Sequence, residues 1–403
     1  MFTGLYPSEH GAYCEANSHK LLQLPDATET VAERLRDEGY TTKGVVANIA
    51  MLLRKSNIHQ GFQYYSTRLP ALPLYGGPVP FSVRKAIVSL IERASDPDVE
   101  RGKYQIAGNI TREASMLMDQ MREFGKPWFL FANYMDAHTP YNPPPPYATR
   151  YSAQPTIPLK TFFAQSEEVM QFKRTFPADV LDPLVAKYDG GIAYLDDQIG
   201  LLNAHLRQLG VYDETMIIIT ADHGEAFGEH ILMGHGVSVY DDQIHVPLLI
   251  KWPRGITRPA DPLPVSGVDI KPTILEVAGL KPGERVSGRS LLGKPESGEI
   301  RIAETYPCND VFNTHPRFHR VERAVLQGPW KLIASTTGGR ELYNLESDPL
   351  ERQNLYRSNI VLGKQLEERL DAWWKGRGRI RSQLPTQLNQ EERDRLKSLG
   401  YVQ

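Results

Sequence analysis

The stretch TADHGEAFGEHILMGHG (residues 220–236) decides how this sequence is interpreted. It follows the apolar run MIII (residues 216–219), which is typical of a buried strand. An acid and a histidine, Asp222 and His223, therefore stand at the end of a strand, and His235 follows in a loop flanked by glycines. A carboxylate oxygen beside an imidazole nitrogen suits a divalent cation, so this strand end is a candidate metal site.

Strand-like and helix-like segments alternate on both sides of this stretch. Apolar runs at residues 127–135 and 246–253 predict two more buried strands, and residues 42–48 predict a short one. Helices are expected at 28–40, 114–125, 183–210 and 268–280, several of them ending at a glycine. This alternation predicts an α/β fold in which helices cover both faces of a large, mainly parallel sheet.

The pattern changes after residue 292. Three strand-like runs at 301–306, 323–335 and 340–345 are followed by an amphipathic helix at 363–376. We therefore expect a catalytic α/β domain over residues 1–292 and a smaller α+β subdomain over residues 293–403.

Composition limits the possible functions. The chain has 403 residues, of which 41% are hydrophobic and 23% charged, with a net charge of −2, so general binding to nucleic acid or to a membrane surface is not expected. No apolar run approaches the roughly 18 residues of a membrane-spanning helix. Cys14 and Cys308 allow one disulfide at most. The first residues show no signal peptide, so we expect a soluble cytoplasmic protein as written, and a periplasmic or secreted one if a leader precedes it.

A second strand end also carries polar side chains. Asp136 and His138 follow the apolar run at 127–135, and ligands of open α/β sheets bind at the carboxyl ends of the strands. Each residue also has a structural interpretation: Asp222 as a helix N-cap, His138 as a hydrogen-bonded structural histidine. His230 and His235 lie five residues apart, which does not match the His-Glu-x-x-His motif of zinc proteases.

At these residues the chain resembles the sulfatase family of the alkaline phosphatase superfamily. The similarity includes residues 220–253, with their Asp-His pair, Gly-Glu-His turn and terminal Trp-Pro, and the segment FLFANYMDAHTPYNPP (residues 129–144). It extends to TGLYPSEHGA (residues 3–12), VDIKPTILEVAGL (268–280), GRSLL (288–292) and the C-terminal block 327–355, all in the family's order. The resemblance implies an alkaline-phosphatase-like fold.

The resemblance also implies roles for individual residues. Asp222 and His223 match two ligands of a single divalent cation, with Ca²⁺ expected first and Mg²⁺ or Mn²⁺ as alternatives. His138 and His235 match groups that contact the sulfate ester and assist its leaving oxygen. Many relatives have Lys in place of His235. The implied substrate is a small-molecule or carbohydrate sulfate ester.

One part of the family pattern has no match. In the family, a first strand ending in two aspartates and the motif Cys-x-Pro-Ser-Arg, whose Cys becomes formylglycine, precede TGLYP, which here begins at Thr3. Cys14 lies after TGLYP, and Ser18 stands where the motif requires Arg. We therefore identify no nucleophile in this chain, interpret it as a shortened form of a longer protein, and expect it to be inactive as given.

Three functions follow from these observations. The first is a metal-dependent, arylsulfatase-like hydrolase of sulfuric esters. The second keeps the fold but acts on phosphorus, as a phosphodiesterase, phosphonate hydrolase or phosphoglycerol transferase. The third is a degenerate, non-catalytic sulfatase-like module. The identity of the nucleophile would separate the first two, because formylglycine indicates a sulfatase, whereas Ser or Thr indicates phosphoryl transfer.

Overall fold

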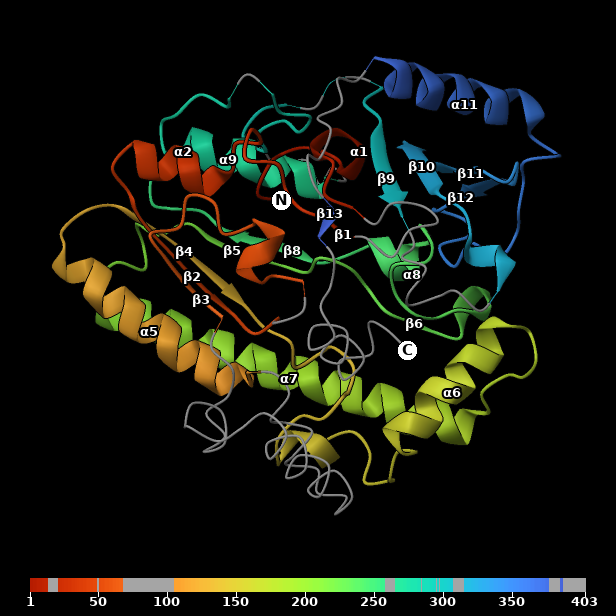
Figure 1. The fold of residues 1–403 in the computed structure, drawn as a ribbon, viewed down its shortest axis with the longest axis horizontal. Helices are drawn as coiled ribbons and strands as arrows, with labels where there is room; N and C mark the ends of the chain where they lie inside the picture. The colour runs from red at the N-terminus through yellow and green to blue at the C-terminus, as the bar shows by residue number, and fades with distance from the viewer. Residues whose placement is uncertain are drawn as a thin grey trace. The chain divides into compact units, whose positions relative to one another are not determined.

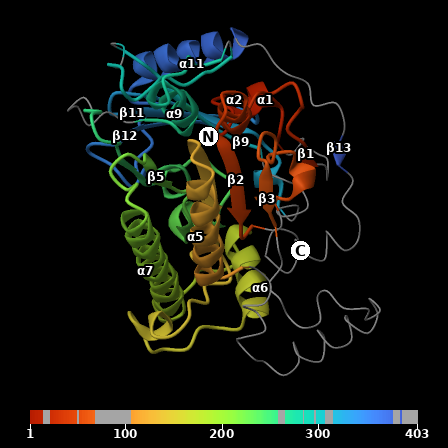
Figure 2. The same cartoon turned by 90° about the vertical axis from the view of Figure 1, so that its left-hand side faces the viewer.

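The computed structural model describes residues 1–13, 21–48, 51–67, 105–257, 265–283, 285–294, 296, 298–306, 315–376 and 385–386. The elements of the chain are labelled in Figures 1 and 2. The chain divides into two compact units. Unit 1 comprises Met1–Arg34, Ser166–Thr175 and Glu214–Gln387, and unit 2 comprises Leu35–Gln165, Phe176–Asp213 and Leu388–Gln403. The expected boundary after residue 292 falls inside unit 1 and stays a prediction. Cys14, Ser18 and Cys308 lie outside the described residues.

Unit 2 contains the parallel sheet that the sequence predicts. Strands β2 (Thr41–Val46), β3 (Tyr64–Ser66) and β4 (Trp128–Asn133) lie in the order β3-β2-β4, and both pairs are parallel. Helix α5 (Ala107–Glu123) packs on β2 and β4, and α7 (Ala178–Gln208) packs against α5. Figure 2 shows α5 running beside β2.

The amphipathic pattern of α5 explains this packing. Its buried apolar residues recur at helical spacing, which gives the helix one apolar face. That face meets side chains from β2 and the end of β4 in a single core, formed by Val45, Ala47, Ile110, Ala114, Leu117, Met121 and Met135. The predicted helix and strands of this region are therefore confirmed, and α5 begins seven residues earlier than expected, at Ala107.

Unit 1 holds the strand that precedes the Asp-His pair. Strand β5 (Ile217–Thr220) pairs with β8 (Leu248–Lys251), and the two run antiparallel. The expectation of a parallel arrangement is wrong for this pair. Between them lie the short hairpin of β6 (Ala226–Phe227) and β7 (Met233–Gly234), with the 3-10 helix Glu229–Ile231 in its turn, and the four-residue helix α8 (Asp241–Ile244). A parallel connection normally needs a longer crossover helix, which this segment does not contain.

A four-stranded antiparallel sheet follows in the same unit. Strands β9 (Arg301–Thr305), β10 (Glu322–Gln327), β11 (Trp330–Ser335) and β12 (Arg340–Asn344) lie in the order β12-β11-β10-β9. Helix α11 (Ile360–Lys375) lies along this sheet and contacts β10 and β11 (Figure 1). The strands and helix predicted after residue 292 are confirmed, except that the predicted run 323–335 forms two strands, β10 and β11, joined by a turn at Gly328 and Pro329.

The core between α11 and this sheet is apolar and aromatic. Val325, Leu332 and Leu342 from the strands meet Leu366 and Trp373 from the helix. Trp373 meets the ring of Tyr6 edge-on, with the ring centroids 5.2 Å apart. Trp373 is therefore a core residue, and it ties the N-terminal segment to the C-terminal sheet of unit 1.

The remaining elements are short or connect these layers. The other α-helices are α1 (Pro7–His10), α2 (Val31–Asp37), α6 (Leu159–Met170) and α9 (Ile270–Val277). Strand β1 (Leu21–Leu22) pairs with β13 (Pro385–Thr386), and short 3-10 helices lie at Arg54–Ser56, Tyr147–Thr149, Glu229–Ile231, Gly267–Asp269 and Pro316–Phe318. Among the described residues, none of the helices combines the length and the apolar character that a membrane span requires.

Two adjacent glycines allow α7 to approach the loop after β4. A Cβ atom on Gly191 would lie 2.4 Å from the carbonyl oxygen of Asp136, and one on Gly190 would lie 2.5 Å from the carbonyl oxygen of Tyr147. Both contacts are with backbone, which cannot yield as a flexible side chain can. The Gly-Gly pair in the sequence therefore marks the place where the helix supports the loop that carries Asp136 and His138.

We expect Gly191→Ala to destabilise the protein by about 1–3 kcal/mol, because the new methyl group forces the backbone of α7 away from this loop. Gly200→Ala is the matched control, since Gly200 lies in the same helix and a Cβ atom there meets nothing within 4 Å. That control should be neutral or stabilising by up to about 1 kcal/mol, through helix propensity. Urea unfolding of both variants measures the difference. Equal stability of the two variants would contradict this role of Gly191.

Candidate functional site

The turn after β5 brings the two predicted metal ligands together. The Oδ1 atom of Asp222 lies 3.7 Å from the Nε2 atom of His223. The Nδ1 atom of His223 donates to the carbonyl oxygen of Gly224 at 2.8 Å, which leaves Nε2 as the nitrogen with a lone pair in the neutral ring. The side chain of Asp222 is 64% exposed and that of His223 is 29% exposed, so a cation can reach both atoms from solvent.

Glycine is required at the centre of this turn. A Cβ atom on Gly224 would lie 2.2 Å from the carbonyl oxygen of Asp242, and its own N–H donates to the carbonyl oxygen of Gln243 at 2.8 Å. The backbone after Asp222 thus runs directly against the segment of α8. The described stretch between β5 and β6 contains no helix, so the interpretation of Asp222 as a helix N-cap is wrong.

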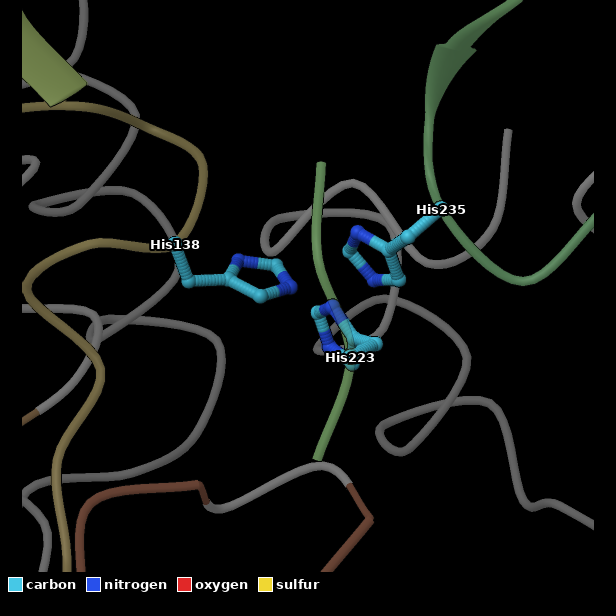
Figure 3. A group of neighbouring side chains, drawn as sticks. All are labelled: His138, His223 and His235. Carbon is cyan, nitrogen blue, oxygen red and sulfur yellow. The ribbon is translucent and has the colours of Figure 1, made fainter. Parts of the chain in front are cut away.

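His235 lies against His223. It follows β7 directly, between Gly234 and Gly236, both of which have positive φ angles (76° and 81°). The two imidazole rings stack with centroids 3.6 Å apart and an interplanar angle of 16° (Figure 3). The Nδ1 atom of His235 is 3.2 Å from the Oε2 atom of Glu225, whose side chain is 4% exposed. Within unit 1 the structure therefore brings together Asp222, His223 and His235 and adds Glu225.

A buried charge cluster fixes the loops that carry this site. Lys331 on β11 is completely buried, and its Nζ atom lies 2.6 Å from the Oδ1 atom of Asp241 and 2.7 Å from the Oε1 atom of Glu351. Glu351 also accepts a hydrogen bond from the backbone N–H of Asp241 at 2.6 Å. These contacts hold the start of α8, which in turn accepts the N–H of Gly224.

The loop around His235 is attached to the same framework. The side-chain oxygen of Gln243 accepts the backbone N–H groups of Val237 and Ser238 at 3.2 and 3.3 Å. The hydroxyl of Thr305 on β9 donates to the carbonyl oxygen of Gly236 at 2.9 Å. Both sides of the site in unit 1 are therefore fastened to the segment Tyr240–Gln243 and to the C-terminal sheet.

Asp136 and His138 lie in unit 2, in the loop after β4. His138 is nearly buried, and its Nδ1 atom donates to the carbonyl oxygen of Thr139 at 2.7 Å, so this histidine also has its Nε2 atom as the lone-pair nitrogen when neutral. Burial raises the pKa of Asp136 to about 7, against the lowering effect of backbone N–H groups that include that of Ala107. Asp136 is 1% exposed, so it supports this loop from inside.

Comparison with known proteins identifies the fold and the family. The structure of the putative sulfatase YidJ from Bacteroides fragilis superposes with a TM-score of 0.66 at 17% identity, covering 93% of this chain and 83% of that one. The phosphonate monoester hydrolase of Silicibacter pomeroyi superposes with a TM-score of 0.63 at 19% identity, over 93% and 83% of the two chains. The fold is thus that of the alkaline-phosphatase-like hydrolases.

The sulfatase family model matches residues 1–280, and the chain therefore belongs to the sulfatase family. A second model, the C-terminal region of N-sulphoglucosamine sulphohydrolase, matches residues 228–375. Among curated proteins, the uncharacterized sulfatase YidJ of Escherichia coli is 27% identical over 62% of this chain and 51% of its own length. Arylsulfatase K of Bos taurus is 34% identical over 46% of this chain and 35% of its own length. The chain thus spans about half or less of the curated relatives it matches.

Sequence reasoning missed the residues that hold the site in place. Glu225 had a detectable signal, because it lies ten residues before His235 with a glycine-containing turn between them, as in a β-hairpin. Lys331 and Glu351 had none, because they lie 90 and 110 residues from Asp241 and only the fold brings them to it.

We expect Lys331→Met to lower the free energy of unfolding by about 3–5 kcal/mol, because it leaves the buried carboxylate of Glu351 and the partly buried carboxylate of Asp241 without their cation. Arg254→Met is the matched control. Arg254 and Glu214 form a surface pair with side chains 70% and 62% exposed, and such pairs contribute at most about 1 kcal/mol. Denaturant unfolding compares the two variants, and similar losses in both would contradict the structural role of Lys331.

The pH dependence of stability should report on Asp242. Burial, followed by the nearby carboxylates of Glu229 and Glu351, raises its pKa to about 7 from an ordinary value of 3.8. The folded state therefore binds this proton more tightly than the unfolded state, and Asp242 lowers stability as the pH rises from about 4 to about 7. Asp242→Asn should match the parent protein near pH 4 and exceed its stability near pH 8, on the order of 1–2 kcal/mol after solvent screening.

Asp348→Asn should change the stability in the opposite direction in the same experiment. The backbone N–H groups of Gln353 and Arg352 lower the pKa of Asp348, so its carboxylate adds stability above its ordinary pKa and this is lost as the pH falls. Unfolding curves are measured at about pH 4 and about pH 8. At the higher pH, Asp242→Asn should be more stable than the parent protein and Asp348→Asn should be less stable. A stability difference between Asp242→Asn and the parent protein that does not change with pH would contradict the raised pKa of Asp242.

Proposed function

We propose that this protein is a metal-dependent hydrolase of sulfuric esters, of the arylsulfatase type. The observation that carries the proposal is the convergence of the Asp222 and His223 donor atoms, 3.7 Å apart, at the end of β5 inside the sulfatase-matching region. Named relatives such as the arylsulfatase of Volvox carteri and the choline-sulfatase of Rhizobium meliloti support the choice of a sulfate ester as substrate.

The donor set fits a hard divalent cation. A carboxylate oxygen and an imidazole nitrogen at this separation can both reach an ion at about 2.0–2.6 Å. We assign the ligand role to Asp222 and His223 and expect Ca²⁺, with Mg²⁺ or Mn²⁺ as alternatives. When bound, the cation would supply Lewis-acid stabilisation of charge on the sulfuryl oxygens.

The chain's own residues supply the proton chemistry. His235 has its Nδ1 atom at the Glu225 carboxylate, and in the protonated ring its Nε2 atom can give a proton to the leaving oxygen of the ester. We assign His138 to contact with the same ester on the basis of the family resemblance. The motif Cys-x-Pro-Ser-Arg does not occur in these 403 residues, and no nucleophile is assigned among them.

Hydrolysis at phosphorus is the second candidate, and one specific observation favours it. Phosphonate monoester hydrolases from Silicibacter pomeroyi and Agrobacterium radiobacter share the fold, with TM-scores of 0.63 and 0.64. A cation held by Asp222 and His223 would serve a phosphoryl group as well as a sulfuryl group, because both carry negative charge on several oxygens.

Three variants of the protein expressed from its own gene test the metal assignment. Asp222→Ala and His223→Ala should each reduce hydrolysis of 4-nitrophenyl sulfate at least about 100-fold and weaken Ca²⁺ binding in calorimetry, because each removes a ligand. His245→Ala, at an exposed histidine, is the control and should retain both properties.

The same assay on 4-nitrophenyl phenylphosphonate decides between the two candidates. A higher kcat/KM for the sulfate supports the sulfatase assignment, and a higher value for the phosphonate replaces it with the second candidate. Removal of metal by a chelator should abolish either activity, and added Ca²⁺ should restore it. Ca²⁺ binding that is unchanged in Asp222→Ala would refute the ligand assignment, whatever the activity.

A further inference from the structure

The β6–β7 hairpin places one acidic side chain directly opposite His235. Its register pairs Ala226 with Gly234 and Phe227 with Met233. Continuing this register by one step sets Glu225 across from His235, where side chains of facing residues contact each other. The observed distance of 3.2 Å between Glu225 Oε2 and His235 Nδ1 agrees with this pairing.

The turn of the hairpin fixes this register. Gly228 has a φ of 114°, and its N–H donates to the carbonyl oxygen of Leu232 at 2.8 Å, which closes the turn. Gly234 has a φ of 76°, a conformation that favours glycine, immediately before His235. A slip by one residue would turn Glu225 to the other face of the hairpin, so the turn determines which side chain meets His235.

The burial of Glu225 requires a partner. Its side chain is 4% exposed, and a carboxylate taken out of water is costly unless it is hydrogen-bonded or paired. His235 provides that pairing through Nδ1, and His223 restrains the same ring by stacking on its face (Figure 3). Because the Nδ1 atom is held by Glu225 and one face of the ring is held by His223, the Nε2 atom points in a fixed direction.

We propose that Glu225 is a positioning residue for His235: its carboxylate accepts the Nδ1 proton, selects that tautomer and directs Nε2 toward the ester. This inference rests on the proposed function for the identity of the reaction, but the hydrogen bond and tautomer it predicts are independent of activity. Glu225 itself does not touch the substrate and acts only through His235.

Nitrogen NMR of the protein labelled at its histidine rings tests the positioning directly. We expect His235 to carry its proton on Nδ1 in the parent protein and in Glu225→Gln, whose amide oxygen can still accept it. In Glu225→Ala the ring should change to a different tautomer or to a mixture. Asp119→Ala is the matched control, because Asp119 contacts His205 Nε2 at 2.8 Å, and it should change the His205 signal but leave His235 unaltered.

Kinetics then connect the tautomer to the reaction. Glu225→Ala should lower kcat about 10–100-fold with KM changed less than about 2-fold, and Glu225→Gln should recover most of that loss. The double variant Glu225→Ala/His235→Ala should be no slower than His235→Ala alone, because Glu225 acts only through His235 and has no further effect once that ring is removed.

The outcomes separate the two proposals. An unchanged His235 tautomer in Glu225→Ala, or an unchanged kcat despite an altered tautomer, would overturn the positioning role. If Glu225→Ala does not fold, Glu225→Gln decides, since a His235 signal without an Nδ1 proton in that folded variant also overturns it. If the protein expressed from its own gene hydrolyses none of the tested esters, the proposed function is refuted, while the tautomer measurement still stands or fails by itself.

Discussion

The site in unit 1 depends on one buried ammonium group. Lys331, near the start of β11, is fully buried and pairs with the buried carboxylate of Glu351 and the partly buried carboxylate of Asp241. Because Asp241 begins α8, this contact determines where the carbonyl oxygen of Gln243 lies, and that oxygen accepts the N–H of Gly224 at the centre of the Asp222–His223 turn. Removing one member of such a cluster leaves uncompensated charge, so the cluster holds its geometry firmly. The C-terminal sheet thus holds the candidate site in place, although Asp222, His223 and His235 all lie outside that sheet.

The C-terminal sequence block of the family has a physical explanation in this arrangement. The Asp348 carboxylate accepts the backbone N–H groups of Arg352 and Gln353, which folds the Asp-Pro turn back on itself. Between them Glu351 adopts a φ of 50°, unusual for a residue with a side chain, and its carboxylate is directed at Lys331. The Asp-Pro turn, which is typical of a protein surface in the sequence, therefore places the buried carboxylate of Glu351 beside Lys331.

The sequence was sufficient to predict the elements but not all of their directions. Apolar periodicity located α5, α7, β4, β5 and the C-terminal strands, because burial of one face requires that periodicity. It did not reveal that β8 runs antiparallel to β5, since an apolar run has the same pattern in either direction. The Asp222–His223 pair was predicted from its place at a strand end, whereas Lys331 and Glu351 were not, because pairs so distant in sequence leave no local signal.

The three histidines differ in what holds their Nδ1 atoms. His138 and His223 each donate to the carbonyl oxygen of the next residue, a contact that the local backbone can provide without help from the rest of the fold. His235 alone depends on a side chain, and that side chain is ten residues away across a hairpin. The orientation of His235 is therefore the one most sensitive to the register of a two-residue ladder. A hairpin this short can hold its register because Gly228 and Gly234 take up conformations that other residues avoid, so the orientation of His235 depends on two residues without side chains.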